Sequence, residues 1–502
     1  MFRNFSTSMV IIVKKITITI TLIYFSILSF SINVKDSLSN SAAGKIFLDN
    51  AITVNSTLYN TVHDSQILTL KYNNNHYVFV LFCSLNPNKY IMNIYNSSTN
   101  KLLLSSNLLS DIVLGSTQWA PRFFQTDSTT VRITFTINKV DVYYRDFSLK
   151  TFKFNSPNRL KVRYELKNGT LSDYVNFTLP VFIQHINNCL HINLNSSEFN
   201  SFSDRSLLIN GTDQPQYENS KYYLTAEVLS DNFKFGDCGG ISCLIESQDL
   251  TNWTLKKPVY AGPSVSSNRN HEMSMTYLNN EWHGLSRYNT DSINGYMSWS
   301  SLDGDIWRKN GLAELPNAIR GYRNSVFVID NKKENACRQI AIIAYQKYDE
   351  QDTLKFIEHH SQRKSIGICL TTDFKKFYEI LEISDPSFKT YPSICMDGDI
   401  LFMSWSSGVG YFLEKIKYSK INIRTLINSS EFALLNTSEF ALEDYKSGII
   451  HWQFSREKQD WSDIIGENDQ TLRYIILECG FIRARVEDCN SLYYSEIVEI
   501  QH

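Results

Sequence analysis

The sequence predicts an all-β protein, a six-bladed β-propeller, and three observations support this fold class. Helical periodicity is scarce, whereas short apolar strands bounded by Asn, Asp, Gly and Ser recur between residues 60 and 420. Six segments of this region share one rhythm: a small residue or Pro, a strand, a polar turn and a second apolar strand. A shorter motif is repeated three times within the same region. Radial repetition of such units protects the edges of their strands.

The six repeated segments are predicted to open the six blades. They are, in chain order, residues 65–68 with 77–82, 119–121 with 131–135, 179–182 with 190–192, 272–275 with 282–285, 323–327 with 340–344, and 391–394 with 400–403. We expect each pair to form the first two strands of one blade.

The shorter motif has a hydroxyl residue, an Asp two residues later and an aromatic residue six residues after the hydroxyl. It occurs as Ser247, Asp249 and Trp253, as Ser301, Asp303 and Trp307, and as Thr371, Asp373 and Phe377. The hydroxyl and the carboxylate can accept hydrogen bonds from the amides of a tight turn. The aromatic ring can then pack beneath that turn. The motif therefore predicts three equivalent structural turns.

Length and composition exclude several classes of protein. The chain has 502 residues, of which 43% are hydrophobic and 20% charged, which suits a large folded core and not a disordered chain. The formal net charge is −2, so no global basic field is available to hold a phosphate backbone. We therefore expect no nucleic-acid partner.

The N-terminus is predicted to direct the chain out of the cytosol. Arg3, Lys14 and Lys15 precede an uncharged run over residues 16–34. This pattern is typical of a signal peptide or of an uncleaved signal anchor, here residues 1–35. Either alternative predicts a secreted or cell-surface protein, and the second adds membrane anchoring. Asn-x-Ser/Thr triplets agree with this location: they begin at Asn55, Asn96, Asn168, Asn176, Asn195, Asn210, Asn252, Asn428 and Asn436.

Nine cysteines in an extracellular chain predict disulfides, and the odd number leaves at least one free or intermolecular thiol. Cys238 with Cys243, and Cys479 with Cys489, lie close enough in sequence to close small loops. The chain has no Cys-x-x-Cys pair and no His-x-x-x-His cluster, so we expect no metal and no cofactor.

The propeller is predicted over residues 45–425, and the rhythm breaks at residues 426–502. Residues 428–435 are followed at once by a near-copy at 436–443, a tandem duplication that is typical of a linker. The rest of the tail predicts a final strand or a small disulfide-tied extension.

Residues 243–408, about a third of the chain, resemble the sialidase and trans-sialidase superfamily in the order of their features. These are the three turn motifs, which resemble Asp boxes, together with Asn270-His271-Glu272, Leu285-Ser286-Arg287, Leu315-Pro316 leading to Arg320, and Tyr391-Pro392-Ser393 before the Asp397-Gly398 turn. In that family the Asp boxes are structural and lie far from the active site.

The resemblance implies a site for sialic acid, with a sialylated glycan or glycoprotein as partner. Tyr391 matches the family's nucleophile and Glu272 matches the carboxylate that activates it. A Tyr hydroxyl approaches the carboxylate-bearing anomeric carbon without a formal charge of its own. Arg287 matches the second guanidinium that clamps the sugar carboxylate, and Arg320 the third, with Arg323 as the near alternative.

The chain also departs from the family. Residues 62–67 stand where the family has its first clamping arginine, and no arginine occurs between Arg3 and Arg122. No Asp or Glu lies between Asp64 and Asp111, where the family has its acid/base aspartate. Residues 404–407 read Ser-Trp-Ser-Ser where the family has the glutamate that holds the first arginine. These departures predict impaired turnover.

Three functions remain open from the sequence. The first is a sialic-acid hydrolase or transferase that uses Tyr391 and Glu272, with His63 or Asp111 as substitute groups. The second is a propeller without catalysis that binds a glycan or a protein. The third is a five-bladed glycosidase of another sugar class, which the Trp119-Ala120-Pro121 stretch suggests.

Overall fold

The structure is a computed structural model, and almost all of its regular structure is β. It describes residues 40–54, 62–85, 88–108, 122–137, 140–193, 207–209, 216–230, 239–260, 271–289, 294–318, 323–329, 339–347, 365–384, 387–409, 412–423, 437–441, 449–455, 458–464, 471–475, 480–488, 491–495 and 497–500. Two helices, α2 (Asn40–Asp49) and α3 (Leu179–Leu190), accompany the strands in these ranges.

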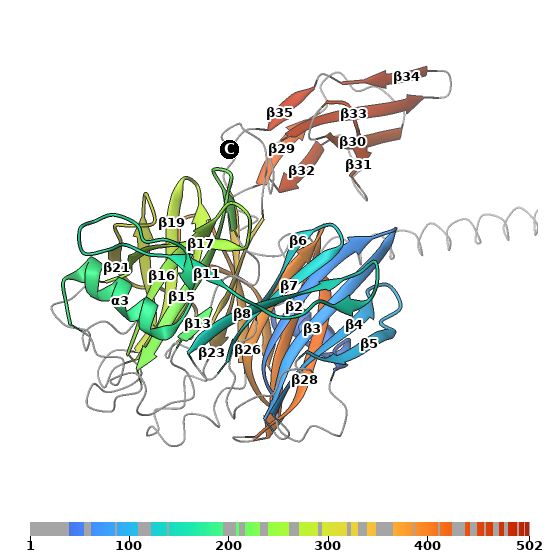
Figure 1. The fold of residues 1–502 in the computed structure, drawn as a ribbon. Helices are drawn as coiled ribbons and strands as arrows, with labels where there is room; N and C mark the ends of the chain where they lie inside the picture. The colour runs from blue at the N-terminus through green and yellow to red at the C-terminus, as the bar shows by residue number, and fades with distance from the viewer. Residues whose placement is uncertain are drawn as a thin grey trace, which may run out of the picture. The chain divides into compact units, whose positions relative to one another are not determined.

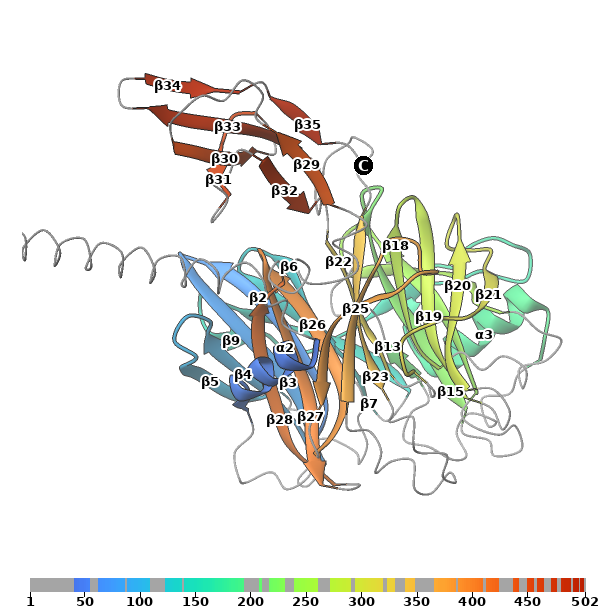
Figure 2. The same ribbon diagram turned by 180° about the vertical axis from the view of Figure 1, so that it is seen from behind.

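Six sheets follow one another along the chain from β2 to β28, and their strands pair antiparallel except for β11 with β17 (Figures 1 and 2). Sheet 1 contains β2 (Val62–Tyr72), β3 (Asn75–Leu85), β4 (Asn88–Asn96) and β5 (Leu102–Asn107). Sheet 2 contains β6 (Arg122–Asp127), β7 (Thr130–Ile137) and β8 (Asp141–Ser148), with the short strands β9 (Lys153–Phe154) and β10 (Asn158–Arg159) on β8. Sheet 3 contains β13 (Leu207–Ile209), β15 (Lys221–Ser230), β16 (Gly239–Ser247) and β17 (Asn252–Pro258), extended by β11 (Lys161–Arg163), β12 (Val175–Asn176) and β14 (Gln216–Glu218).

The other three sheets have four strands each. Sheet 4 contains β18 (His271–Leu278), β19 (Glu281–Asn289), β20 (Asn294–Ser301) and β21 (Arg308–Leu312). Sheet 5 contains β22 (Ser325–Ile329), β23 (Ile340–Lys347), β24 (Ser365–Thr371) and β25 (Tyr378–Ser384). Sheet 6 contains β26 (Phe388–Asp397), β27 (Ile400–Val409) and β28 (Phe412–Asn422), and its fourth strand is β1 (Ile52–Thr53) from the other end of this region.

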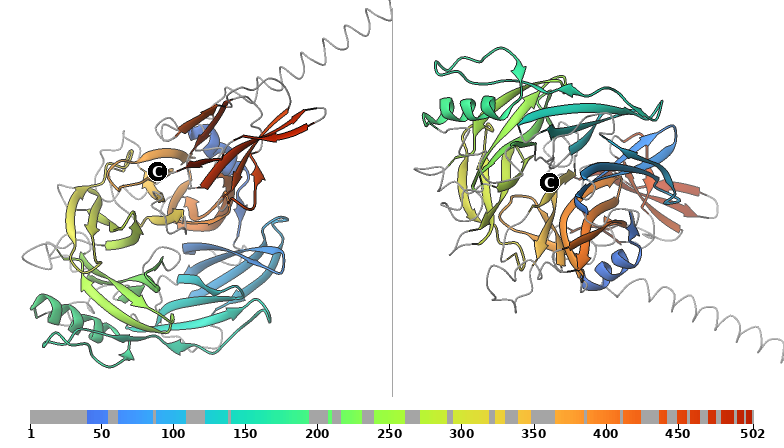
Figure 3. Two further views of the ribbon diagram at one scale, coloured as in Figure 1. Left: turned by 90° about the horizontal axis from the view of Figure 1, so that it is seen from above. Right: turned by 60° about the horizontal axis from the view of Figure 1, so that its bottom comes forward.

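The six sheets form a ring with a propeller-like arrangement. Strand β2 contacts β6, β7 contacts β13, β15 contacts β18, β18 contacts β22, β22 contacts β26, and β26 contacts β2 again. Figure 3 shows the sheets following one another around this ring. Six sheets in one ring do not fit the five-bladed alternative.

A hydrogen bond joins every pair of neighbouring sheets. At least one of its two residues belongs to the first strand of a sheet or directly precedes that strand. Around the ring these bonds are Phe123 N to Gln66 Oε1 (2.7 Å), Thr136 Oγ1 to Leu207 O (2.9 Å), Glu272 N to Glu227 Oε1 (2.9 Å), Ser274 Oγ to Asn324 O (3.3 Å), Ile394 N to Ser325 Oγ (3.1 Å) and Ile67 N to Ser393 Oγ (3.0 Å). Apolar side chains fill the space between sheets. Phe79 of sheet 1, for example, makes edge contacts with Phe123 and Phe147 of sheet 2.

Helix α2 packs on β25 of sheet 5 and on β28 of sheet 6, and Figure 2 labels all three elements. Phe47 is fully buried, its ring lies 5.8 Å from that of Trp405, and its carbonyl accepts a 2.7 Å hydrogen bond from Ser419 Oγ. Gly44 permits the close approach to β25, because a Cβ there would lie 1.7 Å from the Glu382 carbonyl oxygen.

The prediction of a strand pair at 179–182 and 190–192 is wrong, because this segment forms helix α3. Thr178 Oγ1 caps its first turn by accepting from Val181 N, and Pro180 is one of its first residues. Leu179, Phe182, Ile183 and Ile186 are buried on one face, which is helical spacing and not the alternation of a strand. The first strand of sheet 3 is β13 instead.

The three turn motifs form the same turn between the third and fourth strands of sheets 3, 4 and 5. Oδ1 of each Asp accepts two backbone amides, those of residues 251 and 252, 305 and 306, or 375 and 376, at 2.8–3.0 Å. The hydroxyl oxygen accepts the amide of the residue three positions later, and that residue has a positive φ in all three turns. Polar side chains thus close the turn locally, as the sequence predicts.

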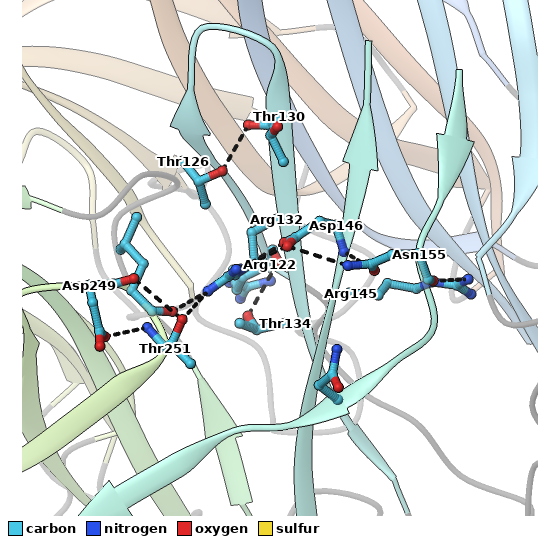
Figure 4. A network of polar contacts seen from close by, with 12 residues as sticks. Arg122, Thr126, Thr130, Arg132, Thr134, Arg145, Asp146, Asn155, Asp249 and Thr251 are labelled. Atoms are coloured by element: carbon cyan, nitrogen blue, oxygen red, sulfur yellow. Dashed lines mark hydrogen bonds and ion pairs between the residues drawn. The ribbon is translucent and has the colours of Figure 1, made fainter. Parts of the chain in front are cut away.

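An arginine of sheet 2 reaches the turn of sheet 3 (Figure 4). Arg132 on β7 makes two hydrogen bonds to the carboxylate of Asp146, at 2.7 and 3.0 Å. Its guanidinium lies over the ring of Tyr144. Its third nitrogen donates to the Leu250 carbonyl and, at 3.5 Å, to Thr251 Oγ1. The bidentate pair with Asp146 orients the guanidinium within sheet 2, and the third nitrogen then joins sheet 2 to the turn of sheet 3.

The C-terminal part is more structured than the short extension expected from sequence. It holds a sheet of β29 (Thr437–Ala441) and β32 (Thr471–Ile475). A second sheet contains β30 (Ile449–Ser455), β31 (Ser462–Asp463), β33 (Gly480–Asp488), β34 (Ser491–Tyr494) and β35 (Val498–Ile500). Ile450, Trp452, Ile482 and Ala484 belong to its buried cluster.

The predicted bond between Cys238 and Cys243 is not present. Cys243 is a free thiol, fully buried among the apolar residues of sheet 3, and burial raises its pKa well above the ordinary value. Cys238, Cys479, Cys489 and the predicted signal segment 1–35 lie outside the described residues. No helix within the described ranges has the length and apolar character that crossing a membrane requires.

The turn carboxylates predict acid-sensitive stability. The amides of Ile306 and Asp305 lower the pKa of Asp303. A carboxyl whose folded pKa lies below its unfolded value stabilises the fold above the unfolded pKa, near 3.9, and loses that contribution as the pH falls through the folded pKa. We expect Asp303→Ala to lower the free energy of unfolding at pH 7 by about 1 kcal/mol, as for a lost helix cap, and so to lower the Tm. The substitution should also weaken the dependence of the Tm on pH below about 4.

Thermal unfolding followed by circular dichroism between pH 3 and pH 7 measures both effects. Leu302→Ala is the matched control, because this neighbouring side chain is 80% exposed and its loss should leave the Tm unchanged. Equal Tm values for Asp303→Ala and the parent at pH 7 would contradict the role of the turn.

Candidate functional site

Glu272 and Tyr391 occupy the same irregularity in two different sheets. The pairing of β18 with β19 shifts between His271 and Ser274, and that of β26 with β27 shifts between Thr390 and Ser393. Both residues have a positive φ, 49° and 54°, and both are buried. Positive φ is uncommon for residues other than glycine and marks local backbone strain, which often occurs at functional sites.

The hydrogen bonds between sheets place these residues at equivalent positions in their sheets, two residues before a residue that bonds to the next sheet. We call this set of positions the site level. Gln66, Ser274, Ser325 and Ser393 each contact the next sheet of the ring. Two residues before each of them stand Asp64, Glu272, Arg323 and Tyr391. The pairing of β2 with β3 shifts between His63 and Gln66, so Asp64 lies in the same kind of irregularity. The described side chains at this site level are therefore one acid, one guanidinium and one phenol, contributed by sheets 4, 5 and 6, whereas the side chain of Asp64 lies outside the described residues.

A carboxylate and a guanidinium meet within sheet 4. His271 pairs with Arg287 across β18 and β19, and Arg287 Nη1 lies 3.5 Å from Glu272 Oε2. Both side chains are largely buried. The backbone amide of Glu272 also donates to Glu227 Oε1 of sheet 3 at 2.9 Å, and Glu227 is fully buried. Sheet 3 thus holds the backbone from which the Glu272 carboxylate projects.

Arg323 brings a buried positive charge to this level. The residue precedes β22 in the chain. Burial lowers the pKa of its guanidinium to about 10, and the nearby Tyr391 has the opposite effect, because its negative charge would raise that pKa. The guanidinium still carries its charge at neutral pH. Tyr391 is held from the other side, because Ser65 Oγ of sheet 1 donates to its carbonyl oxygen at 3.4 Å. A weakly hydrated cation beside a phenol is suited to pairing with a carboxylate.

The remaining expected site residues cannot be placed in this geometry. Arg320 and Asp111 lie outside the described residues, as does the side chain of His63, whose backbone belongs to β2. Among the alternatives for the third guanidinium, the structure describes Arg323 and places it at the site level. Glu272, Arg287, Arg323 and Tyr391 are thus brought to sheets 4, 5 and 6, which are consecutive in the ring.

Sheet 6 presents hydroxyls where sheet 4 presents a guanidinium. Ser406 pairs with Thr390 across β26 and β27, as Arg287 pairs with His271 across β18 and β19. The hydroxyls of Ser404 and Ser406 are buried and have no hydrogen-bond partner among the described residues. The resemblance predicts an arginine-holding glutamate in this strand, and residues 404–407 contain none.

Sequence reasoning missed the common level and the support from Glu227. The sequence did contain a pattern that indicates the site level, because Glu272, Arg323 and Tyr391 are each followed two positions later by a serine. Glu227 gave no signal, because its role depends on the contact between sheets 3 and 4. Within the described ranges, no group of three or more His, Cys, Asp or Glu side chains could hold a metal ion.

No protein-family model and no curated protein matches the sequence. Among solved structures, a Trypanosoma rangeli sialidase in complex with sialic acid matches with a TM-score of 0.48 and 8% identity, over 87% of this chain and 71% of that one. A protein of unknown function from Dyadobacter fermentans matches with a TM-score of 0.48 and 10% identity, over 74% and 97% of the two chains. A mutant of the NanB sialidase from Streptococcus pneumoniae matches with a TM-score of 0.44 and 10% identity, over 74% and 70%. Since all three TM-scores lie below 0.5, the function proposed below depends on the residues of the site.

The buried guanidinium predicts a stability penalty at the site. Replacing Arg323 by Met should raise the Tm by about 1–3 °C, because Met fills similar volume without the desolvation of a cation. Differential scanning calorimetry measures the change. Arg308→Met is the matched control in sheet 4, since the Arg308 side chain is 74% exposed, and its Tm should not move. A Tm several degrees lower in Arg323→Met would show that the contacts of the guanidinium outweigh its burial.

Proposed function

We propose that this protein is a divergent six-bladed propeller of the sialidase type that recognises terminal sialic acid on glycoconjugates and turns it over slowly or not at all. The observation that carries this proposal is the common level of Glu272, Arg323 and Tyr391, with Arg287 paired to Glu272 at 3.5 Å. Sialic acid carries its carboxylate on the anomeric carbon. Arg287 and Arg323 would clamp that carboxylate, since guanidinium groups pair with carboxylates through parallel hydrogen bonds.

Any turnover would use Tyr391 and Glu272. The phenol would attack the anomeric carbon, Glu272 would accept its proton, and the leaving oxygen would need a proton from a further acid. The chain has no Asp or Glu between Asp64 and Asp111 to serve as that acid in the family's place. General acid catalysis typically contributes about 10²–10⁴-fold, so its loss leaves recognition and little hydrolysis or transfer.

The sequence of sheet 1 also weakens the clamp for catalysis. The chain has no arginine between Arg3 and Arg122, so the first guanidinium of the family's clamp is missing. Two guanidinium groups can still hold a ligand in its ground state. Catalysis needs contacts that strengthen in the transition state, and these require all groups in place. A binding propeller therefore fits the site better than an efficient enzyme.

The N-terminal segment 1–35 supports delivery outside the cytosol, as a secreted or surface-anchored protein. The partner we propose is accordingly a sialylated glycan or glycoprotein in the extracellular space. No cofactor enters this proposal.

Binding and turnover of sialosides test the proposal. Purified protein should bind methyl α-sialoside in isothermal titration calorimetry, and Arg287→Ala and Arg323→Met should each weaken binding by about tenfold or more, as loss of a charge-assisted pair requires. Release of the aryl group from an aryl sialoside should be far slower than for a family enzyme. This substrate is lenient, because an aryl leaving group needs little protonation.

Arg308→Ala serves as the binding control, because its exposed side chain lies on the outer strand β21 of sheet 4. Rapid release that Tyr391→Phe abolishes would establish an enzyme and overturn the preference for recognition. Sialoside binding that survives both arginine substitutions unchanged would overturn the site itself.

A further inference from the structure

A hollow lies between sheets 1 and 6 at the opposite end of their strands from Tyr391. Its volume is about 560 Å³, within the range of about 300–1,000 Å³ of small-molecule sites. The turn after β2, the turn after β26 and the turn after β4 line it, whereas Tyr391 lies near the start of β26. The lining residues include Asn74, Asn75, His76, Asn96, Ser98 and Lys420. This hollow is therefore separate from the candidate site.

Asn96 is both a lining residue and the start of an Asn-x-Ser triplet with Ser98. Its side-chain oxygen caps the turn, because Oδ1 accepts the amides of Ser98 and Thr99 at 3.1 and 3.0 Å and both of their hydroxyls. Its nitrogen Nδ2 has no hydrogen-bond partner among the described residues. Attachment of a sugar uses Nδ2 and keeps the oxygen, so the cap would survive the modification.

We propose that Asn96 carries an N-linked glycan whose first sugar lies in this hollow, and the inference rests on the proposed delivery outside the cytosol. The donor class is an oligosaccharide linked to a lipid pyrophosphate. The new bond joins Nδ2 to the anomeric carbon of the sugar, and the bond from that carbon to the pyrophosphate oxygen breaks. The lipid pyrophosphate leaves with the bonding electrons, and the amide loses one proton to solvent.

The chemistry of the lining suits a sugar. Asn74, Asn75 and Ser98 offer amide and hydroxyl groups to sugar hydroxyls. His76 Nδ1 lies 2.5 Å from Asp397 Oδ2, and this pair leaves the second imidazole nitrogen for a ligand. Lys420 donates to the Ser97 carbonyl and its ammonium lies 5.8 Å from the centre of the Phe402 ring, so an apolar surface adjoins the polar groups.

Two other triplets provide internal comparisons. Asn168 lies in an exposed turn, where its Oδ1 accepts from Thr170 N and Oγ1, and it does not line the hollow. Asn252 uses its Nδ2 to donate to Asp249 Oδ2 at 2.9 Å within the turn of sheet 3. We therefore expect glycans on Asn96 and Asn168, of which only the first is sheltered by protein.

The test uses the full chain with its own N-terminal segment, produced in cultured animal cells. Mass spectrometry of peptides should find glycan on both Asn96 and Asn168. Peptide-N-glycosidase acting on the native protein should release the Asn96 glycan at least tenfold more slowly than the Asn168 glycan, and the difference should vanish after denaturation. Ser98→Ala should remove the Asn96 glycan and lower the Tm. The matched variant Thr170→Ala loses the same kind of hydroxyl contact to its asparagine and should remove the Asn168 glycan without moving the Tm.

A bare Asn96 beside a glycosylated Asn168 would overturn the inference and leave the proposed delivery standing. Bare residues at both positions would overturn both. Equal release rates in the native protein would show that the sugar does not occupy the hollow, and this outcome would also overturn the inference.

Discussion

The ring depends on one kind of contact, a hydrogen bond from or beside the first strand of a sheet to the neighbouring sheet. Six such bonds connect all six neighbouring pairs, and four of them use Gln66, Ser274, Ser325 and Ser393, which stand at equivalent positions in four sheets. These polar atoms are buried, so an unmade bond would cost about 1–3 kcal/mol each. The same atoms therefore set the register in which every first strand faces its neighbours.

That register determines what the site can contain. Because the residues two positions earlier share one level, the side chains of Glu272, Arg323 and Tyr391 determine the chemistry there. These three side chains are the ones that the proposed recognition of an acidic sugar uses. The opposite ends of the same strands are turns, and between sheets 1 and 6 these turns enclose the hollow beside Asn96. One set of strands thus presents two different surfaces.

The sequence predicted the parts of the fold that repeat. Four of the six strand pairs, the strand at 131–135 and all three turns were predictable, because alternation and local side-chain capping act within a few residues. Residues 119–121, the first part of a fifth pair, lie outside the described residues. Helix α3 was missed because Leu179, Phe182 and Ile183 read equally as a short apolar strand when the helical spacing is not followed to Ile186. In the site, Glu272 and Arg287 were predictable from their motifs, whereas the support from Glu227 arises only when sheets 3 and 4 meet.

The energetic cost of the site argues that it has a role beyond closing the ring. Glu272 and Tyr391 hold positive φ angles, which cost of order 1–3 kcal/mol each for residues other than glycine. Arg323 adds a desolvated cation, and Ser404 and Ser406 add buried hydroxyls without described partners. Glycine at the strained positions and an apolar residue at 323 would close the same ring at lower cost. A ligand that carries a carboxylate would offset part of this cost by pairing with Arg287 and Arg323, and hydroxyls on that ligand could satisfy buried serines. The proposed recognition site requires strain and burial of this kind, which a bound ligand relieves. The proposed slow turnover follows from the acid that the chain lacks between Asp64 and Asp111.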